Sequence, residues 1–153
     1  MTESDLGWLA GIIDGEGTIT LCEVHKYDRE KIGYSVNVCV SSTDTKIAYH
    51  TMDLMKEMNI QPAIQILKRD IASNHKDAYQ VRITNYFEIE IYLRMIQKYL
   101  VGKQEQAYWM LEYIKQRELE GKNQPIGDLS RTIANKIRSL NTKGKVVTGK
   151  DVK

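Results

Sequence analysis

Residues 9–17 read Leu9-Ala10-Gly11-Ile12-Ile13-Asp14-Gly15-Glu16-Gly17. They end a predicted helix that carries an apolar side and begins near Ser4 or Asp5, either of which is a suitable N-cap. Gly7 and Gly11 lie four residues apart and therefore share one helical face. Because neither has a side chain, a second helix can approach that face backbone to backbone. The two glycines at the end, Gly15 and Gly17, permit a sharp exit from the helix.

Two carboxylates, Asp14 and Glu16, stand at the C-terminal end of this helix. The helix dipole is negative there, so the position disfavours acidic side chains. An acid in such a place indicates a compensating cation. Mg²⁺ takes oxygen ligands and keeps several waters, so one carboxylate, a main-chain carbonyl and a phosphate oxygen are a suitable ligand set.

Period-two alternation follows the helix and predicts two hairpins. The first comprises strands near 18–24 and 31–41, and the second comprises strands near 63–69 and 78–84. Helices are predicted between the hairpins, near 45–58, and after them, near 86–99, 103–119 and 127–140. The order αββαββααα predicts an α+β fold, an αββαββα core with a four-stranded antiparallel-type sheet backed by helices, plus C-terminal helices. The length of 153 residues fits one domain. We assign it to residues 1–141 and treat 142–153 as a basic C-terminal tail.

Helices can cover one side of this sheet, which leaves the other side to polar residues. An ordinary solvated sheet face is one interpretation. The other is base reading in a DNA major groove, because Asn and Gln suit adenine, Arg suits guanine, and Asn and Gln are weak strand formers. The candidate residues are Thr20, Cys22, Val24, Lys26, Ser35, Asn37, Cys39, Gln65, Arg69, Gln80, Arg82 and Thr84.

Positive charge is concentrated at the C-terminus. The net charge is +2, but residues 131–153 contain seven Lys or Arg and one acid, Asp151. Basic tails of this kind contact phosphates or only increase solubility, and the pattern does not decide between the two.

The cysteines and the hydropathy pattern indicate the cellular compartment in which we expect the protein. There are two cysteines, Cys22 and Cys39, so no disulfide framework is expected. We expect an intracellular, reducing compartment, cytoplasm or organelle. No secretory signal and no membrane-spanning run is recognisable.

The stretch 9–17 closely resembles the LAGLIDADG motif of homing endonucleases, with Ile12 for Leu, Gly15 for Ala and Glu16 for the second Asp. The resemblance implies that Glu16 is the catalytic metal ligand, with Gly15 contributing its carbonyl, and that Asp14 has a structural or indirect role. It also implies a saddle-like sheet that lies along DNA.

A second stretch, Tyr99-Leu100-Val101-Gly102-Lys103-Gln104-Glu105-Gln106-Ala107, resembles the segment of single-motif members that carries a catalytic-site lysine. The match places that lysine at Lys103, where its charge would stabilise a developing phosphorane or polarise the attacking water. The family's water-organising polar residue corresponds to Ser42. Helix N-capping is the alternative role for Ser42.

A single motif in a protein that cuts two DNA strands implies a homodimer of the single-motif type, joined through the first helix. The expected interface residues are Gly7, Trp8, Ala10, Gly11 and Asp14. The resemblance implies a site-specific endonuclease that hydrolyses one phosphodiester per strand of a long pseudo-palindromic site and leaves short 3′ overhangs. Mg²⁺ is the expected cofactor, with Mn²⁺ or Ca²⁺ able to substitute for binding.

The tail, through Lys143, Lys145 and Thr148, is expected to contact DNA near the centre of the site. Two other functions remain open from the sequence: an RNA-binding intron maturase with the same motif, and a DNA-binding regulator without cleavage. No cofactor fingerprint of a metabolic enzyme is present.

Overall fold

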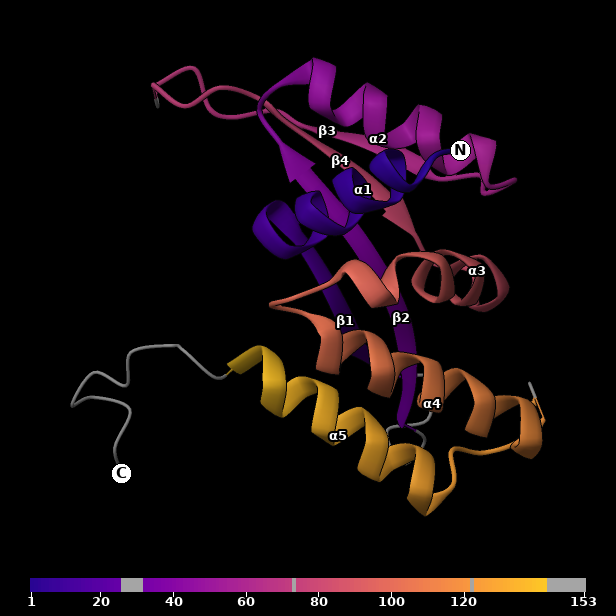
Figure 1. Ribbon diagram of the computed structural model, residues 1–153. Coiled ribbons are helices and arrows are strands. Elements are labelled where there is room, and N and C mark those ends of the chain that lie inside the picture. Colours follow the sequence, from indigo (N-terminus) through magenta and orange to yellow (C-terminus); the bar gives the residue numbers. More distant parts are fainter. Residues whose placement is uncertain (26–31, 73, 122, 143–153) are drawn as a thin grey trace.

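A computed structural model describes residues 1–25, 32–72, 74–121 and 123–142 (Figure 1). The elements follow the predicted order of helices and strands. They are α1 (Glu3–Glu16), β1 (Gly17–His25), β2 (Ile32–Ser42), α2 (Thr45–Glu57), β3 (Ala63–Leu67), β4 (Ala78–Ile83), α3 (Tyr86–Ile96), the short 3-10 helix η1 (Gln97–Tyr99), α4 (Gln104–Glu120) and α5 (Asp128–Thr142). The α+β prediction is therefore confirmed.

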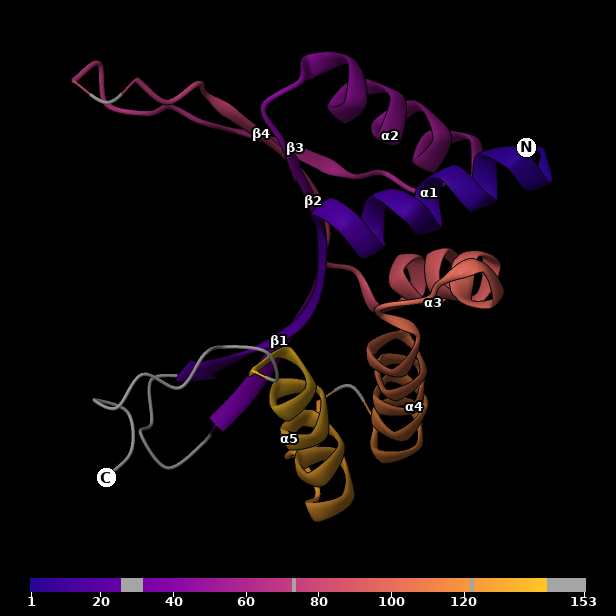
Figure 2. The same ribbon diagram turned by 60° about the vertical axis from the view of Figure 1, so that its left-hand side comes forward.

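The four strands form one antiparallel sheet in the order β1-β2-β4-β3. Figure 2 shows that the sheet is strongly curved, that the helices lie on one side of it, and that the other side is open. The curvature is an accumulated strand twist, which a sheet with one uncovered face tolerates. The described part of the chain thus presents a concave sheet surface.

The core lies between the sheet and the helices. Ile19 of β1 and Val38 of β2 are completely buried, as are Leu9 and Ile13 of α1. These alternate strand positions are the ones that the period-two pattern assigns to the covered face. Burial of such apolar side chains stabilises the fold by roughly 2 kcal/mol each. None of the helices in the described ranges is both long and apolar enough to cross a lipid bilayer.

Helix α1 begins and ends in well-defined caps. The Thr2 hydroxyl oxygen accepts the Asp5 amide over 3.1 Å, and the Asp5 carboxylate accepts the Thr2 amide over 2.7 Å. Thr2 is therefore the N-cap, and the prediction of Ser4 or Asp5 is wrong, because the reciprocal pair that closes the helix end starts at Thr2.

At the other end of α1, Gly17 is both the C-cap of the helix and the first residue of β1, so no loop separates the two elements. A Cβ atom at Gly17 would lie 2.7 Å from the Ile13 Cα, which is closer than real atoms approach. Only glycine fits this junction.

The last two helices are held to the sheet and to each other by polar contacts. Arg138 of α5 forms an ion pair with Glu23 of β1. Where α4 turns into α5, the Glu120 carboxylate pairs with the buried Arg117 and accepts the Ser130 hydroxyl over 2.7 Å. Helix α5 extends to Thr142, one residue past the boundary expected at 141.

Candidate active site and nucleic-acid interface

Glu16 is the last residue of α1 and its side chain is exposed. Within the described ranges, no hydrogen bond or ion pair engages its carboxylate. The carbonyls of the last helical turn have no intrahelical partners and also project at this end. The C-terminal end of α1 therefore offers a free carboxylate together with carbonyl oxygens.

Lys103, at the N-terminus of α4, contacts the C-terminal end of α1. Its ammonium donates a hydrogen bond to the main-chain oxygen of Asp14 over 2.7 Å. A cation is favourable there because it opposes the negative end of the helix dipole. The fold thus brings two of the three residues expected to be catalytic, Glu16 and Lys103, to one helix end.

Asp14 faces its own chain. Its carboxylate oxygens accept the main-chain amides of Val101 and Lys103, over 2.8 and 2.9 Å. Both carboxylate oxygens are thus used within the subunit, and the predicted place of Asp14 at a dimer interface stays a prediction.

Ser42 ends β2, and its hydroxyl accepts the Asp44 amide over 3.0 Å. Asp44, not Ser42, is the N-cap of α2, since its carboxylate accepts the Lys46 amide over 2.9 Å. Gly17 lies opposite Val40 in the sheet, so Ser42 stands two residues beyond the strand position that faces the α1 junction. Its expected role in orienting water stays a prediction.

The donor atoms at the α1 end are all oxygens, which fits a hard divalent cation such as Mg²⁺. In the described part of the chain, no three His, Cys, Asp or Glu side chains come together to hold a metal. One carboxylate per chain is an incomplete ligand set. A divalent cation at this helix end would need further oxygens from another source, such as a second copy of the chain or a phosphate.

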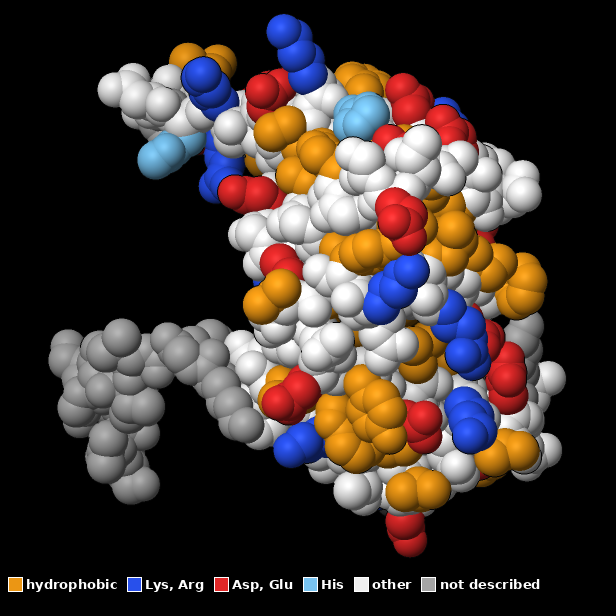
Figure 3. All heavy atoms as spheres, viewed as in Figure 1, with side chains coloured by type: hydrophobic (Ala, Val, Ile, Leu, Met, Phe, Trp, Pro, Cys, Tyr) orange, Lys and Arg blue, Asp and Glu red, His pale blue; other side chains and the backbone are white. Residues whose placement is uncertain are grey.

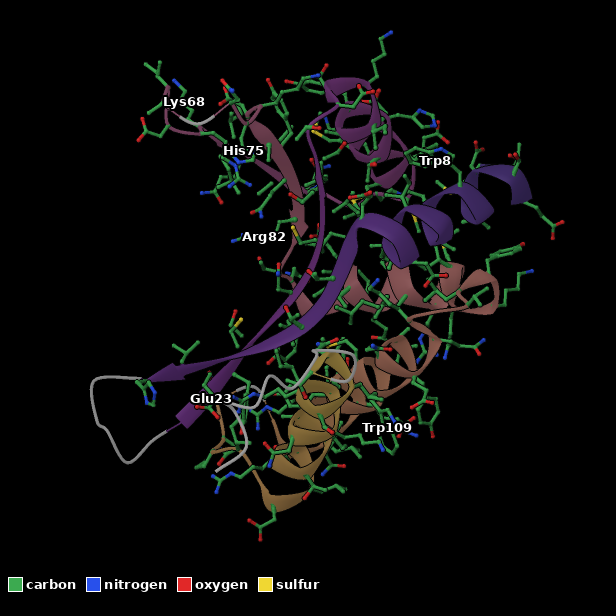
Figure 4. The ribbon with its side chains drawn as sticks, turned by 90° about the vertical axis from the view of Figure 1, so that its left-hand side faces the viewer. Trp8, Glu23, Lys68, His75, Arg82 and Trp109 are labelled. Carbon is green, nitrogen blue, oxygen red and sulfur yellow. The ribbon has the colours of Figure 1, made fainter. Side chains whose placement is uncertain are left out.

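The open face of the sheet carries most of the polar residues expected there. In Figure 4 Arg82 lies on this side of the sheet, whereas Trp8 and Trp109 lie on the helical side. Cross-strand neighbours on this face are Thr20 and Asn37, Cys22 and Ser35, Cys39 and Arg82, and Gln65 and Gln80. Two further residues, Thr18 and Ser41, share the face because they lie opposite Cys39 and Gln80.

The candidate base-reading residues expected from the sequence did not include these two, although Thr18 is two positions from Thr20, and Ser41 two from Cys39, in the same alternation.

Arg82 makes polar contacts with its neighbours on this face. Its Nη2 donates to the Gln80 Oε1 over 2.9 Å, and it lies beside the Cys39 thiol, whose pKa is raised by burial and partly lowered by the Arg82 charge. Arg82 Nε and Asn37 Oδ1 are both inaccessible to solvent and have no hydrogen-bond partner among the described atoms. Unpaired buried polar atoms are costly, and the hydroxyls of Tyr92 and Tyr113 in the core are also without a partner among the described atoms.

Other expected contact residues lie at the margins. Val24 is exposed on β1, whereas Arg69 and Thr84 are exposed just beyond the ends of β3 and β4 rather than in the strands, as had been expected. Figure 4 shows Lys68 and His75 on the segment that joins β3 and β4, which projects past the sheet. Lys26, Lys143, Lys145 and Thr148 lie outside the described residues.

The outer face of α1 carries a strip of glycines. A Cβ atom added at Gly7, Gly11 or Gly15 would meet nothing within 4 Å, so space is open above all three. Trp8 is half-buried and packs edge-on against His50 with ring centroids 4.6 Å apart. Ala10 is completely buried in the subunit's own core, so the expectation that it forms part of a dimer interface is wrong.

The helical side of the molecule shows no charge pattern that is typical of a nucleic-acid-binding surface. Figure 3 shows acidic and basic side chains interspersed over the face that it presents, without a broad region of one sign. Nothing on that face resembles a phosphate-binding stripe. The concave sheet face is the better candidate for nucleic acid.

No protein-family model and no curated protein sequence matches this chain. Solved structures do match it. The homing endonuclease I-CvuI in complex with its target superposes with a TM-score of 0.71 at 21% identity, over 96% of this chain and 89% of that one. The archaeal intron-encoded homing endonuclease I-Vdi141I, complexed with DNA, has a TM-score of 0.67 at 16% identity, over 93% and 87% of the chains. The LAGLIDADG homing endonuclease I-GzeII, with its DNA target, has a TM-score of 0.61 at 12% identity, over 96% and 47%.

The fold is that of the LAGLIDADG homing endonucleases. At these identities the likeness concerns the fold alone. The superposition with I-GzeII includes 96% of this chain but only 47% of the longer I-GzeII chain. One copy of the LAGLIDADG fold thus corresponds to about half of that longer endonuclease.

Proposed function

We propose that this chain is a site-specific double-strand DNA endonuclease that acts as a homodimer with a divalent metal ion. The observation that carries the proposal is the junction at Gly17. It connects a free carboxylate, Glu16, directly to the first strand of a concave polar sheet. Lys103 lies at the same helix end.

The concave face supports DNA binding. A curved antiparallel ribbon fits the major groove, where hydrogen-bonding side chains distinguish base pairs. Asn37 and Arg82 are partly exposed on this face and carry an amide and a guanidinium group, the types of side chain that suit adenine and guanine edges. The basic segment after Thr142 would add phosphate contacts.

The glycine strip on α1 supports a homodimer. Gly7, Gly11 and Gly15 leave the helix backbone accessible, so an identical helix can pack closely against it. A twofold axis at this place would bring the two α1 ends, and therefore two Glu16 carboxylates, toward each other. The twofold symmetry implies a pseudo-palindromic target.

The residues at the α1 end support phosphodiester hydrolysis. A divalent ion, when bound, lowers the pKa of water and stabilises negative charge on phosphate oxygens. Glu16 and the Gly15 carbonyl are the proposed ligands on this chain. The Lys103 ammonium is free to exchange its carbonyl partner for a phosphate oxygen as negative charge develops. The Ser42 hydroxyl is proposed to orient water.

The function is tested by incubating the full chain with a library of random double-stranded DNA and Mg²⁺. We expect enrichment of one long pseudo-palindromic site, cut in both strands with short 3′ overhangs, and no products with EDTA. Glu16→Gln is the matched control, because it keeps the side-chain shape and removes the charge. It should bind the selected site and not cut it.

The same experiment distinguishes the other functions. Sequence-specific binding without cleavage at any Mg²⁺ concentration would show a DNA-binding regulator. Preference for a folded intron RNA over every DNA of the library would show a maturase. Cleavage by Glu16→Gln at the wild-type rate would overturn the metal assignment.

A further inference from the structure

Asp14 connects two segments that are far apart in the sequence. Its Oδ2 accepts the amide of Val101, 87 residues away, over 2.8 Å. Its Oδ1 accepts the amide of Lys103, 89 residues away, over 2.9 Å. Hydrogen bonds to an ionised carboxylate are about twice as strong as neutral ones. One side chain therefore fixes both ends of the three-residue segment that precedes α4.

That segment has little else to hold it. The Val101 side chain is 87% exposed, and Gly102 has no side chain to pack. A Cβ atom at Gly102 would lie 3.6 Å from Asp14 Oδ1, which shows that the segment passes directly over the carboxylate. The hydrogen bonds to Asp14 therefore tether residues 101–103, in addition to the Lys103 carbonyl, which accepts the Ala107 amide over 3.0 Å.

The tether determines where the Lys103 side chain starts. Lys103 occupies the N-cap position of α4 but makes no side-chain cap there. Its ammonium instead reaches the main-chain oxygen of Asp14 over 2.7 Å. Asp14 thus binds Lys103 twice, at the main-chain amide and at the ammonium, two residues before Glu16.

We infer that Asp14 is a positioning residue of the cleavage reaction, which holds the Lys103 ammonium at the C-terminal end of α1, the helix end that carries Glu16, through the main-chain amides of Val101 and Lys103. This inference rests on the proposed endonuclease function. Both carboxylate oxygens of Asp14 are engaged by main-chain amides, so its proposed action is on the position of Lys103. Misplacing a charged group by about 1 Å costs roughly 100-fold in rate, so a small shift of the ammonium is enough to slow cleavage.

The test is a double-mutant cycle on the site selected from the library. Asp14→Asn removes the negative charge and places an amide hydrogen against one of the two main-chain donors. We expect single-turnover cleavage to slow roughly 100-fold, while the Kd for DNA changes by less than about twofold. Asp14→Asn combined with Lys103→Ala should be no slower than Lys103→Ala alone, since both changes remove the same interaction.

Glu3→Gln is the matched control. Glu3 also connects α1 to the region before α4, by accepting the Tyr99 hydroxyl over 3.2 Å and lying 3.7 Å from the Lys98 ammonium. Loosening that contact should leave the cleavage rate within about twofold of wild type. Asp14→Glu, which restores the charge, should recover part of the rate lost in Asp14→Asn. If the asparagine variant does not fold, the cycle is run with Asp14→Glu.

A second readout does not depend on cleavage. Hydrogen exchange at the Val101 and Lys103 amides should accelerate in Asp14→Asn and not in Glu3→Gln. Unchanged exchange at both amides, or rate losses from Asp14→Asn and Lys103→Ala that multiply in the double variant, would overturn the inference. Failure of the wild-type chain to cut any library member would instead overturn the proposed function.

Discussion

Asn141 of α5 donates a side-chain hydrogen bond to the main-chain oxygen of Ile19 in β1 over 2.9 Å. The contact holds the C-terminal end of α5 against the first strand of the sheet. Figure 2 shows that α5 ends beside β1. The chain therefore leaves its last helix next to the proposed DNA-binding surface.

Truncation after Thr142 removes Lys143, Lys145, Lys150 and Lys153. We expect weaker binding to every DNA sequence, and a slope of log K against log salt that becomes shallower by about 0.9 for each phosphate that the shortened chain no longer neutralises. Binding titrations from low to high salt measure this slope. An unchanged slope would show that the segment only increases solubility.

Arg82→Ala should relax base preference rather than abolish binding. If Arg82 reads guanine, the loss is about 1–3 kcal/mol at one symmetric pair of positions. The measurement is a comparison of relative affinities for all single-base variants of the selected site. Gln65, which is exposed on the edge strand β3, provides a control position, since its change to Ala should affect a different base pair. A uniform loss across all variants would make Arg82 a phosphate contact.

Gly11→Ala should have opposite effects on the subunit and on the dimer. The new Cβ atom meets nothing within the subunit. Replacing an exposed helical glycine by alanine stabilises the helix by about 1 kcal/mol. At a close helix–helix contact the same methyl group separates the backbones, so the dimer should dissociate at a higher concentration. Sedimentation gives the dimer Kd. A tighter or unchanged dimer would exclude this face as the interface.

Gly17→Ala is the contrasting variant, because its Cβ atom would clash with the Ile13 backbone 2.7 Å away. It should destabilise the subunit itself, which a lower unfolding midpoint at a fixed protein concentration would show.

The turn between α4 and α5 should make stability depend on pH. Burial raises the pKa of Glu120, but hydrogen bonds from Ser130 and Arg117 outweigh burial and leave it below the ordinary value of 4.5. The stabilisation that Glu120 gives is therefore fully present above about pH 4.5 and is lost as the pH falls through the lowered pKa.

Glu120→Gln leaves the Arg117 guanidinium buried without its charge partner and should cost about 3 kcal/mol at neutral pH. Urea unfolding of both proteins, at pH 7 and near pH 3, tests the expectation that this difference shrinks in acid. Glu118→Gln, on the exposed side of the same helix, is the control. A difference that is the same at both pH values would contradict the assignment.

The local parts of this structure were predictable because each depends on neighbouring residues. Alternation with period two predicted that Ile19 and Val38 face the core, and both are fully buried. The nine residues from Leu9 predicted a helix that ends in a carboxylate at a glycine turn. The N-cap was missed because Thr2 pairs with an aspartate, whereas the usual capping box has Glu or Gln in that place.

The resemblance implied a structural or indirect role for Asp14, but its partners could not be predicted, since they are 87 and 89 residues away and are main-chain amides without a sequence signature. The same applies to the face of α1. Ala10 and Gly11 are neighbours, but α1 packs with Leu9, Ala10 and Ile13 inward, and this orientation places the glycines outward. Only the tertiary packing distinguishes the two sides.

The direct passage from helix to strand at Gly17 fixes the distance between the proposed cleavage site and the proposed recognition surface. No hinge separates the residue proposed to cut from the strand proposed to read, so the number of base pairs between the scissile bond and each recognised base is built into the backbone. New base preferences can be introduced on the sheet without moving the point of scission, whereas a residue inserted at the junction would shift the cut relative to the sequence that is read.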